Sequence, residues 1–488
     1  MGEQYHFLAI DFGASSGRGE LVTLEDGVLH LQEIHRFENR PVKMGGTMYW
    51  DLPYLFGEVI ETLKVVAKRG IKLAGIGVDT WGVDFGLLAA DGKLLSNPVH
   101  YRDARTENIH AYSDPIMSRD EVFAATAMEP WSIGSLFQLL AMQRDNSPLL
   151  KAADTMLWMA DLFRYFLCGK KVAELSLAQT SCLIGTNRKL SSEVVKRFKL
   201  RRKMFPQLVR PPLVLGDLLP EIVQAAGLTG PVPVIATAGH DTAAAVAAVP
   251  ARGSDWAFLS CGTWSITGTL VKHPVATPEA LRMGYSCECT IGDWFTCKNI
   301  PGLWVVQELR RKWHSSEDPW DFNRMVAEAA AVSEVPLFDV NHPTLMAPAD
   351  MEDALRKLLA GGAHLDRGHL VRSALESLAA EYARSIDAIA TLTGKRPSAL
   401  YMVGGGIKNK LLCQLTADAC NMTVYAGVDE CTAVGNGLGQ ALALGIIKTK
   451  GDIRKIARAS FEMSTFMPEN RQHWQARLAQ YAQLQAGK

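Results

Sequence analysis

The sequence predicts an α/β protein made of two similar halves, each a mixed β-sheet flanked by helices, placed around a central cleft. Two observations support this fold class. A strand, a turn rich in glycine and hydroxyl residues, and a second strand occur over residues 9–25 and again over residues 255–271. A chain of 488 residues also exceeds the size of one ordinary hydrophobic core. An internal repeat of this length indicates a duplicated domain, with one turn from each half facing the cleft.

The N-terminal half begins with three predicted strands and a helix. An apolar strand ends at Asp11, and after the turn ASSGR the strands RGELVTLE and VLHLQEIHRF are joined at Asp26-Gly27. That dipeptide is typical of a type I′ hairpin, so the three strands form an antiparallel meander. A helix then begins after the N-cap Asp51, carries a proline in its first turn and ends at Gly70. The strands LAGIGVDT and VDFGLLAA follow.

The C-terminal half repeats this order. DWAFLSCGTWSITGTLV is again strand, turn and strand, and YSCECTIGDWFTCKN adds a hairpin. A helix ending at Gly394 carries one apolar face, formed by Leu375, Leu378, Tyr382, Ile386 and Ile389. The strand ALYMV then enters the glycines 404–406, followed by a helix from about Asn409, the strand NMTVYAG and the small-residue helix AVGNGLGQALALG. We expect the boundary near Pro250, which gives the domains 1–250 and 251–488.

The composition excludes several classes of protein. Lys plus Arg and Asp plus Glu each total 51, so the chain has no overall basic field for a nucleic acid or an anionic membrane. No secretion signal and no apolar run long enough to cross a bilayer are visible. Nine cysteines without CxxC pairs indicate buried thiols in a reducing compartment. We therefore expect a cytoplasmic protein without nucleic-acid or membrane partners; monomer and homodimer are both open.

The turn at residues 13–18 has two interpretations. A Walker-type phosphate loop is excluded, because Arg18 is followed by a strand and not by a helix. Successive backbone N–H groups in such a turn can still bind an anion, and Asp11 beside it suits a magnesium–phosphate complex. Alternatively, the segment is an ordinary glycine-rich hairpin in which Asp11 caps a turn.

The stretch VPVIATAGHDTAAAVAAV delivers His240 and Asp241 from the end of a buried strand to the first turn of an alanine-rich helix. Ligands gather at the carboxyl ends of strands in α/β folds, and a helix N-terminus favours a carboxylate. Asp241 could equally be only an N-cap. Three glycine-rich turns combined with Asp11 and Asp241 favour a nucleotide cleft with a metal and a base, which are the parts that phosphoryl transfer needs.

These stretches resemble a known family. DFGASSGRGE, IGVDTWGVDFGLL, YRDART, AGHDTAAAV, SCGTWS, KNIPGLW and MVGGGIKNKLL follow the order and spacing of the FGGY carbohydrate kinases, within the actin-like ATPase superfamily. The resemblance extends from residue 6 to about residue 465 and implies two duplicated actin-like, or ribonuclease H-like, domains. Family members usually carry threonine where Ala14 stands; ASSGR and DTWGVDF are closer to the rhamnulokinase branch.

The resemblance implies a role for each matching residue. Asp241 would be the general base, and Asp11 would act on Mg²⁺ through water. The positions that match ATP contacts are Ala14, Ser15, Ser16, Gly17, Arg18, Thr263, Gln307 and Gly405. The positions that match sugar contacts are Gly82, His240, Asp241, Thr242 and Asn299. Domain 1–250 would then carry the sugar site, the base and the first phosphate turn, and domain 251–488 would bind the nucleotide.

The implied reaction is ATP- and Mg²⁺-dependent phosphorylation of a ketose. The branch implies L-rhamnulose, phosphorylated at its primary O1 hydroxyl to L-rhamnulose 1-phosphate in rhamnose catabolism. L-Fuculose and D-xylulose are alternative substrates. An actin-like switch that hydrolyses ATP onto water is an alternative of another class, since it shares the phosphate turns but does not need a base such as that in GHD.

Several single residues have local alternatives. Gly405 could serve only a strand-to-helix turn, Thr263 could satisfy its own backbone, and Asn299 could be a locally bonded loop residue. A charged trio, Arg102, Asp103 and Arg105, could contact substrate or lock the domains together. Asp84 in TWGVDF is the next candidate for the base if Asp241 is only a cap.

Overall fold

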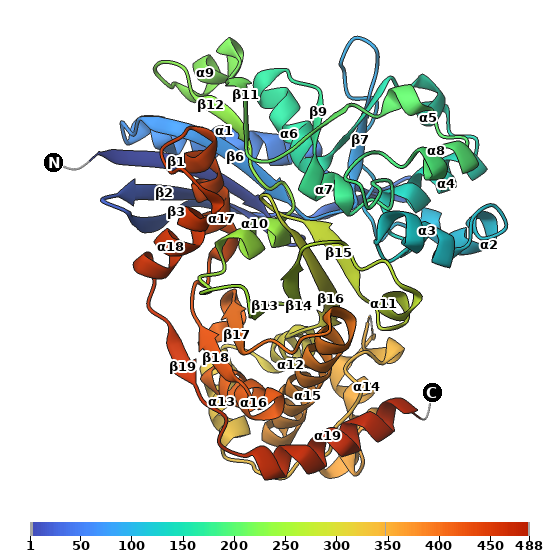
Figure 1. Ribbon diagram of the computed structural model, residues 1–488, viewed down its shortest axis with the longest axis vertical. Helices are drawn as coiled ribbons and strands as arrows, with labels where there is room; N and C mark the ends of the chain where they lie inside the picture. The colour runs from blue at the N-terminus through green and yellow to red at the C-terminus, as the bar shows by residue number, and fades with distance from the viewer. Residues whose placement is uncertain (1–2, 347, 487–488) are drawn as a thin grey trace. The chain divides into compact units, whose positions relative to one another are not determined.

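A computed structural model describes residues 3–346 and 348–486 of the chain (Figure 1). These residues form two compact units. Unit 1 comprises Met1–Pro250, Val271–Thr296 and Cys431–Ser460. Unit 2 comprises Ala251–Leu270, Cys297–Glu430 and Phe461–Lys488. The first passage between the units falls at Pro250, and the chain then enters unit 1 twice more. The division of functions between residues 1–250 and 251–488 stays a prediction.

Unit 1 is built on a six-stranded mixed sheet with the order β11-β12-β6-β1-β2-β3. The strands are β1 (Gln4–Phe12), β2 (Ser16–Glu25), β3 (Val28–Glu38), β6 (Leu73–Thr80), β11 (Leu213–Asp217) and β12 (Pro233–Ala236). β1 pairs antiparallel with β2 and parallel with β6, β6 pairs parallel with β12, and β12 pairs antiparallel with β11. The expected antiparallel meander of β1, β2 and β3 is therefore confirmed.

Unit 2 repeats this topology. Its strands follow the order β16-β14-β13-β17-β18-β19. Their bounds are β13 (Ala257–Cys261), β14 (Trp264–Val271), β16 (Trp294–Pro301), β17 (Ala399–Val403), β18 (Thr423–Ala426) and β19 (Ser464–Phe466). β13 pairs antiparallel with β14 and parallel with β17, β17 pairs parallel with β18, and β18 pairs antiparallel with β19. Because each pairing matches its counterpart in unit 1, the predicted duplication of a mixed α/β domain is confirmed.

Helices flank both sheets. Those of unit 1 are α1 (Leu52–Lys68), α2 (Ile109–Ser113), α3 (Arg119–Thr126), α4 (Ser135–Arg144), α5 (Pro148–Ala152), α6 (Met159–Cys168), α7 (Leu175–Gln179), α8 (Ser192–Arg197), α9 (Pro220–Ala226), α10 (Asp241–Ala248), α11 (Pro278–Arg282), α17 (Cys431–Ala443) and α18 (Lys450–Ser460). Those of unit 2 are α12 (Trp304–Trp313), α13 (Phe322–Ala330), α14 (Met351–Leu358), α15 (Arg367–Thr393), α16 (Lys410–Cys420) and α19 (Arg471–Ala486).

Short elements complete the two units. Two-stranded sheets pair β4 (Pro41–Met44) with β5 (Thr47–Trp50), β7 (Phe85–Leu88) with β8 (Thr155–Trp158), and β9 (Val172–Glu174) with β10 (Gln207–Val209). β15 (Ser286–Cys289) pairs with β16 and lies in unit 1. The 3₁₀ turns are η1 (Ala104–Thr106), η2 (Arg202–Met204), η3 (Pro343–Leu345), η4 (Gly362–His364) and η5 (Gly405–Lys408).

Local sequence signals account for several boundaries. Asp26 and Gly27 both have positive φ, as a type I′ turn between β2 and β3 requires. Asp51 caps α1 by accepting a hydrogen bond from the backbone N–H of Tyr54 at 3.2 Å. Gly394 follows the last residue of α15 in the left-handed conformation, which ends that helix as predicted.

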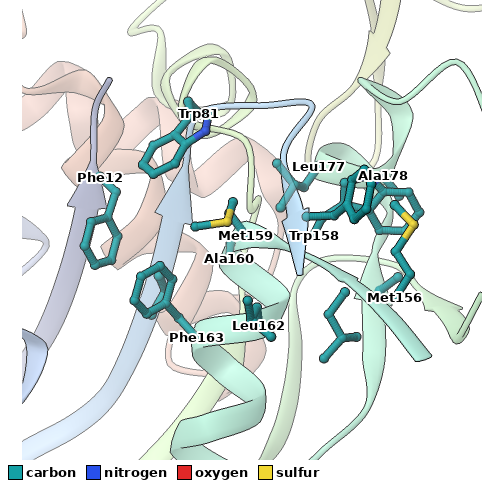
Figure 2. Close-up of a cluster of buried hydrophobic side chains, with 14 of the residues drawn as sticks. Phe12, Trp81, Met156, Trp158, Met159, Ala160, Leu162, Phe163, Leu177 and Ala178 are labelled. Atoms are coloured by element: carbon teal, nitrogen blue, oxygen red, sulfur yellow. The ribbon is translucent and has the colours of Figure 1, made fainter. Parts of the chain in front are cut away.

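The core of unit 1 lies where α6 packs against the sheet and against β8 (Figure 2). The rings of Phe12 on β1 and Phe163 on α6 stack with their centroids 4.3 Å apart. Both side chains are fully buried, as are Met156 and Leu162. Because Phe12 directly follows Asp11, this packing fixes the end of β1 at which the first predicted phosphate turn begins.

The segment 431–460 lies in unit 1 although it comes near the end of the chain. Figure 1 shows α17 and α18, in red, beside the blue strands β1, β2 and β3. Gly435 on α17 lies so close to α10 that a Cβ atom there would be 1.9 Å from the carbonyl oxygen of Ala244. Gln440 donates to the backbone oxygen of Leu8 on β1 at 3.0 Å. Small residues in AVGNGLGQALALG therefore let α17 pack against both α10 and the sheet.

The cysteines match the expectation from the sequence, since all nine are buried and none forms a disulfide. Burial raises the pKa of several of these thiols, for example that of Cys289 to about 12. Among the helices of the described residues, none is both long and apolar enough to cross a membrane.

Candidate active site

The first glycine-rich turn connects the antiparallel strands β1 and β2. Asp11 and Arg18 stand opposite each other in the strand register, and Arg18 Nε lies 3.1 Å from Asp11 Oδ2. The turn leads into a strand and not into a helix, so the exclusion of a Walker loop is confirmed. Ala14 and Ser15 at its tip are exposed, whereas Asp11 is buried. The turn therefore presents its backbone to solvent above a buried carboxylate.

Packing from β3 holds this turn in place. Asn39, directly after β3, donates from Nδ2 to Gly13 O at 2.8 Å and from its backbone N–H to Ser15 O at 3.1 Å. Ser16 and Gly17 begin β2, and a Cβ at Gly17 would lie 2.2 Å from the ring of Phe37. Sequence reasoning did not identify Asn39, because its hydrogen bonds close a loop of 26 residues.

The turn before α10 is fixed by buried polar groups. The backbone N–H of Gly239 donates to Glu174 Oε2 at 2.8 Å and to Ser176 Oγ at 3.0 Å. A Cβ at Gly239 would lie 2.8 Å from Glu174 Oε2 and 3.1 Å from Arg164 Nη2, so only glycine allows these groups to approach. Glu174 also caps α7 through the backbone N–H of Ser176 at 2.6 Å. The backbone just before His240 and Asp241 is therefore rigidly placed.

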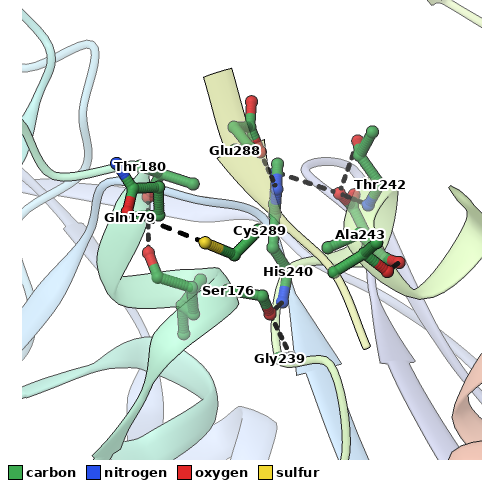
Figure 3. Close-up of polar contacts among 12 residues, drawn as sticks. Ser176, Gln179, Thr180, Gly239, His240, Thr242, Ala243, Glu288 and Cys289 are labelled. Carbon is green, nitrogen blue, oxygen red and sulfur yellow. Dashed lines mark hydrogen bonds and ion pairs between the residues drawn. The ribbon is translucent and has the colours of Figure 1, made fainter. Parts of the chain in front are cut away.

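His240 lies between two carboxylates. Its Nδ1 is 2.7 Å from Glu288 Oε2 on β15, and its Nε2 is 3.3 Å from Asp241 Oδ1. Figure 3 shows the side chain of Glu288 pointing at His240. Burial by itself lowers the pKa of His240, but Glu288, Asp241 and Glu174 outweigh this effect and raise the pKa to about 9. His240 is therefore a cation at neutral pH.

Asp241 is the first residue of α10, and His240 occupies the N-cap position without a side-chain capping bond. Asp241 Oδ1 accepts hydrogen bonds from the backbone N–H of Thr242 at 2.5 Å and from Thr242 Oγ1 at 3.1 Å. Within the described parts of the chain, no donor reaches Oδ2, and the Asp241 side chain is 33% exposed. One oxygen thus stabilises the helix start, and the other is available to accept a proton.

Three carboxylates converge at this end of the unit 1 sheet. Asp79 near the end of β6 is fully buried, and burial together with Asp11 and Asp241 raises its pKa well above the usual range. Asn436 on α17 opposes this by donating from Nδ2 to Asp79 Oδ2 at 2.5 Å. Burial raises the pKa of Asp241 as well, with His240 opposing and Asp11 adding to the rise.

Asp11 is the one of these carboxylates that suits a divalent cation, held through water. Among the described residues, no donor reaches Asp79 Oδ1, although that atom is buried. Repulsion between Asp11 and its strand neighbour Asp79 is relieved by a nearby cation, and Mg²⁺ prefers oxygen ligands such as water and phosphate. No three acidic or imidazole groups within residues 3–346 and 348–486 are close enough to hold a metal by themselves. The residues therefore suit an ion held largely by water and phosphate oxygens.

The predicted sugar residue Gly82 follows β6 and directly precedes a strained residue, Val83. A Cβ at Gly82 would lie 2.9 Å from Thr180 Oγ1, which accepts the backbone N–H of Val83 at 3.0 Å. Val83 has a φ of 69°, a conformation that β-branched residues rarely adopt. Such strain persists where the surroundings enforce it, and it is common at functional sites.

Asp84, the alternative candidate for the base, is occupied by other contacts. Its Oδ2 accepts from the indole N–H groups of Trp50 at 2.6 Å and Trp81 at 3.0 Å, and its Oδ1 accepts from Gln138 Nε2 at 2.8 Å. Burial raises the pKa of Asp84 to about 6 although these donors lower it. A fully buried carboxylate enclosed by donors suits a structural group, so Asp241 stays the predicted base.

The charged trio after β7 has partners inside unit 1. Asp103 accepts from the backbone N–H groups of Met48 at 2.7 Å and Arg105 at 3.0 Å. Arg105 donates to the side chain of Gln138, and Arg102 lies over the ring of Tyr101. Local contacts therefore account for Asp103 and Arg105.

In unit 2, two predicted nucleotide residues lie together. Thr263, in the turn between β13 and β14, donates from Oγ1 to Gln307 Oε1 on α12 at 2.9 Å. This contact replaces the local alternative in which Thr263 bonds its own backbone. Gln307 also lines a pocket of about 470 Å³ with the basic side chains Arg310, Arg311 and His314. Such a lining suits a ligand with negative charge.

The glycines after β17 have different roles. Gly404 has a φ of 85°, and a Cβ at Gly406 would lie 2.3 Å from Cys261 Sγ, so both are required by the turn itself. Gly405 is exposed, and a Cβ there would meet open space. Packing within the protein does not require a glycine at position 405, unlike at positions 404 and 406. Asn299 lies on β16 in unit 2.

Comparison with known proteins decides the family. The N-terminal domain of the FGGY family of carbohydrate kinases matches residues 6–248, and its C-terminal domain matches residues 257–444. The chain belongs to this family. It is therefore an ATP-dependent carbohydrate kinase, and the resemblance drawn from the sequence is confirmed.

Curated relatives of this kinase span nearly its whole length. It is 37% identical over 477 residues to the rhamnulokinase of Bacteroides thetaiotaomicron, covering 96% of this chain and 97% of the relative. It is 35% identical over 472 residues to the rhamnulokinase of Enterococcus faecalis, covering 94% and 93% of the two chains.

Solved structures share the fold of the kinase. The crystal structure of gluconate kinase from Lactobacillus acidophilus is similar with a TM-score of 0.83 at 17% identity, covering 99% of this chain and 98% of that one. Plasmodium falciparum glycerol kinase with ADP is similar with a TM-score of 0.80 at 15% identity, with the same two coverages. At these identities the likeness confirms the fold class and nothing finer.

Proposed function

We propose that this kinase transfers the γ-phosphoryl group of ATP to the O1 hydroxyl of L-rhamnulose, giving L-rhamnulose 1-phosphate and ADP, as a step of rhamnose catabolism. The rhamnulokinase relatives support the substrate. The single observation that carries the chemistry is Asp241, whose Oδ2 is available at the head of α10 beside the cationic His240.

In the proposed step, Asp241 accepts the proton of the sugar O1 hydroxyl as that oxygen forms its bond to the γ-phosphorus. The bond between the γ-phosphorus and the bridging oxygen breaks, and ADP leaves with the electron pair. A carboxylate suffices as base because the hydroxyl ionises only as the phosphoryl group arrives. His240, Thr242, Gly82 and Asn299 would bind the sugar and orient its hydroxyl.

The phosphates would be held by the first turn, through the backbone of residues 14–17 and Arg18. The predicted nucleotide residues Thr263, Gln307 and Gly405 would contact the ATP molecule from unit 2. Mg²⁺ would neutralise phosphate charge when bound, and Asp11 would hold it through water. Asp11 is also paired with Arg18, so one contact fixes both groups.

A cytoplasmic location is part of this proposal. Nine buried thiols without a disulfide are typical of a reducing compartment, and the proposed reaction consumes ATP.

A panel of ketoses tests the proposal. Purified protein with ATP and Mg²⁺ is assayed by coupled ADP release with L-rhamnulose, L-fuculose and D-xylulose, and the product is identified by phosphorus NMR. We expect the highest kcat/KM with L-rhamnulose and phosphorylation at O1. Strong turnover of another ketose without turnover of L-rhamnulose would assign a sister substrate. ATP consumption that no sugar changes would favour a nucleotide switch over a sugar kinase.

A further inference from the structure

Glu288 is a buried acid that the sequence did not connect with catalysis. It lies on β15 in the segment Val271–Thr296, which belongs to unit 1, and its Oε2 is 2.7 Å from His240 Nδ1. The two side chains are 6% and 11% exposed, so water screens their attraction little. A buried carboxylate at this distance stabilises the charged form of the imidazole.

The opposite nitrogen of the same ring faces the proposed base. His240 Nε2 lies 3.3 Å from Asp241 Oδ1, so each ring nitrogen lies within ion-pair distance of a carboxylate oxygen, and each contact is favourable only when that nitrogen carries a proton. Glu174 at the start of α7 adds a third acid near the ring, through the turn at Gly239. Arg164 on α6 approaches that turn but is paired with Asp161 at 3.1 Å.

We propose, building on the function proposed above, that Glu288 is a positioning residue for phosphoryl transfer, which acts by holding the His240 imidazolium against Asp241. The cation beside Asp241 favours the ionised carboxylate that can accept a proton. It also leaves the His240 Nε2–H directed at the end of α10 where the sugar hydroxyl is proposed to lie. Without Glu288 the ring is free to rotate and to lose its charge at neutral pH.

Glu288→Gln removes the charge and keeps the shape. The amide oxygen can still accept from Nδ1–H, but the ring no longer needs a second proton, so Nε2 turns a lone pair toward Asp241. We expect kcat/KM for the ketose to fall by about tenfold or more at neutral pH. We also expect the alkaline limb of the kcat profile, near pH 9 in the unmodified kinase, to move toward the ordinary imidazole value of about 6.5.

The experiment measures pH profiles of kcat and KM for the unmodified kinase, Glu288→Gln and the control Glu279→Gln. Glu279 lies in the same segment, on α11, and is exposed, so Glu279→Gln removes the same charge at a distance from His240. NMR titration of the His240 ring without substrate, assigned by its absence in His240→Asn, reports the protonation directly. Thermal melts verify folding; if Glu288→Gln does not fold, Glu288→Asp, which keeps the charge, replaces it and should retain the alkaline limb while its KM rises.

A double-mutant cycle separates positioning from mere packing. If Glu288 acts through His240, Glu288→Gln should lower kcat/KM only slightly in a protein that already carries His240→Asn. Additive losses, or an alkaline limb and a His240 titration that are unchanged in Glu288→Gln, would overturn the role of Glu288. Absence of ketose phosphorylation by the unmodified kinase would instead contradict the proposed function, so the two failures are distinguishable.

Discussion

Asp241 and Asp11 are both buried or half-buried acids at the same end of the unit 1 sheet, but their neighbours differ. Asp241 Oδ1 accepts a hydrogen bond from Thr242, and Asp241 lies beside His240, whereas Asp11 is paired with Arg18. A carboxylate with an available oxygen suits a base, and one fixed by arginine near a phosphate turn suits a bound cation and its water shell.

Asp241→Asn tests the base. The amide keeps the oxygen that accepts from Thr242, so the free energy of unfolding should change by less than about 1 kcal/mol. No group then accepts the hydroxyl proton, so kcat should fall by about 10²- to 10⁴-fold. Steady-state assays with L-rhamnulose and ATP, accompanied by a thermal melt, check both values. Near-normal turnover would mean that Asp241 only stabilises the start of α10.

Asp11→Asn is the matched comparison. Because Asp11 is proposed to hold Mg²⁺ through water, this variant should need more Mg²⁺ and recover part of its activity when the Mg²⁺ concentration is raised. Asp241→Asn should show no such recovery. Titration of kcat/KM with Mg²⁺ distinguishes the two acids, and identical responses would contradict their separate roles.

Gly405→Ala tests the nucleotide contact in unit 2. A methyl group at this position meets open space in the protein, so stability should change by no more than about 0.5 kcal/mol. If a nucleotide lies against the glycine, ADP affinity measured by calorimetry should fall by about tenfold.

Gly404→Ala serves as the control for Gly405→Ala. Gly404 has a φ of 85°, and a Cβ there would lie 3.0 Å from Cys261 O, so this variant should lose about 1–3 kcal/mol of stability. Unchanged ADP binding by Gly405→Ala would argue against a nucleotide contact at position 405.

At the scale of elements, α17 packs against both the strand that carries Asp79 and the helix that begins at Asp241. Asn436 reaches Asp79, and a Cβ at Gly77 on β6 would lie 2.3 Å from Asn436 Oδ1. Gly435 one residue earlier lets the helix approach α10, whose first residue is Asp241. One helix therefore fixes the distance between the sheet end that carries Asp79 and the helix that carries the proposed base.

Gly435→Ala should lower the free energy of unfolding by about 1–3 kcal/mol, because the new methyl group would overlap the Ala244 carbonyl and the helices must separate. The same substitution at Gly57 in α1, which is exposed and has open space around it, should raise stability by about 0.5–1 kcal/mol. Denaturant unfolding of both variants is the measurement. Equal effects would show that α17 and α10 are not tightly packed.

At the scale of the whole molecule, unit 1 is assembled from three separate segments of the chain. Residues 1–250 contain the sheet but lack α17, α18 and β15. Without them, Asp79 loses Asn436, His240 loses Glu288, and the face of β1 and β6 that α17 covers is open to water.

A fragment of residues 1–250 should therefore not fold cooperatively. We expect helix and strand content by circular dichroism, strong binding of a hydrophobic dye and no sharp thermal transition, as the exposure of an uncovered sheet face predicts. The full-length chain, under the same conditions, provides the reference. A cooperative transition in the fragment at the temperature of the full-length chain would show that the later segments are dispensable.

The sequence by itself determined the elements and the family. Local signals such as Asp26-Gly27, Asp51 and Gly394 set a turn, a helix start and a helix end, because each acts within a few residues of its own position. The repeated strand–turn–strand pattern predicted the duplicated sheet, and the seven motifs from DFGASSGRGE to MVGGGIKNKLL predicted the carbohydrate kinase family. The roles of the individual site residues stay predictions.

Only the tertiary structure decided which segments surround the proposed base. Glu288 is 48 residues from His240 in the sequence, and Asn436 is 357 residues from Asp79. Neither contact follows from a local sequence pattern.

 Strand pairing and helix packing bring such residues together, because the burial of apolar faces is favourable wherever the partners lie in the chain. The sequence shows which faces are apolar but not which of them pack against each other. The same physics places Asp84 among buried donors and leaves Asp241 with an available oxygen, so the environment of each acid, and not its type, separates the structural group from the proposed base.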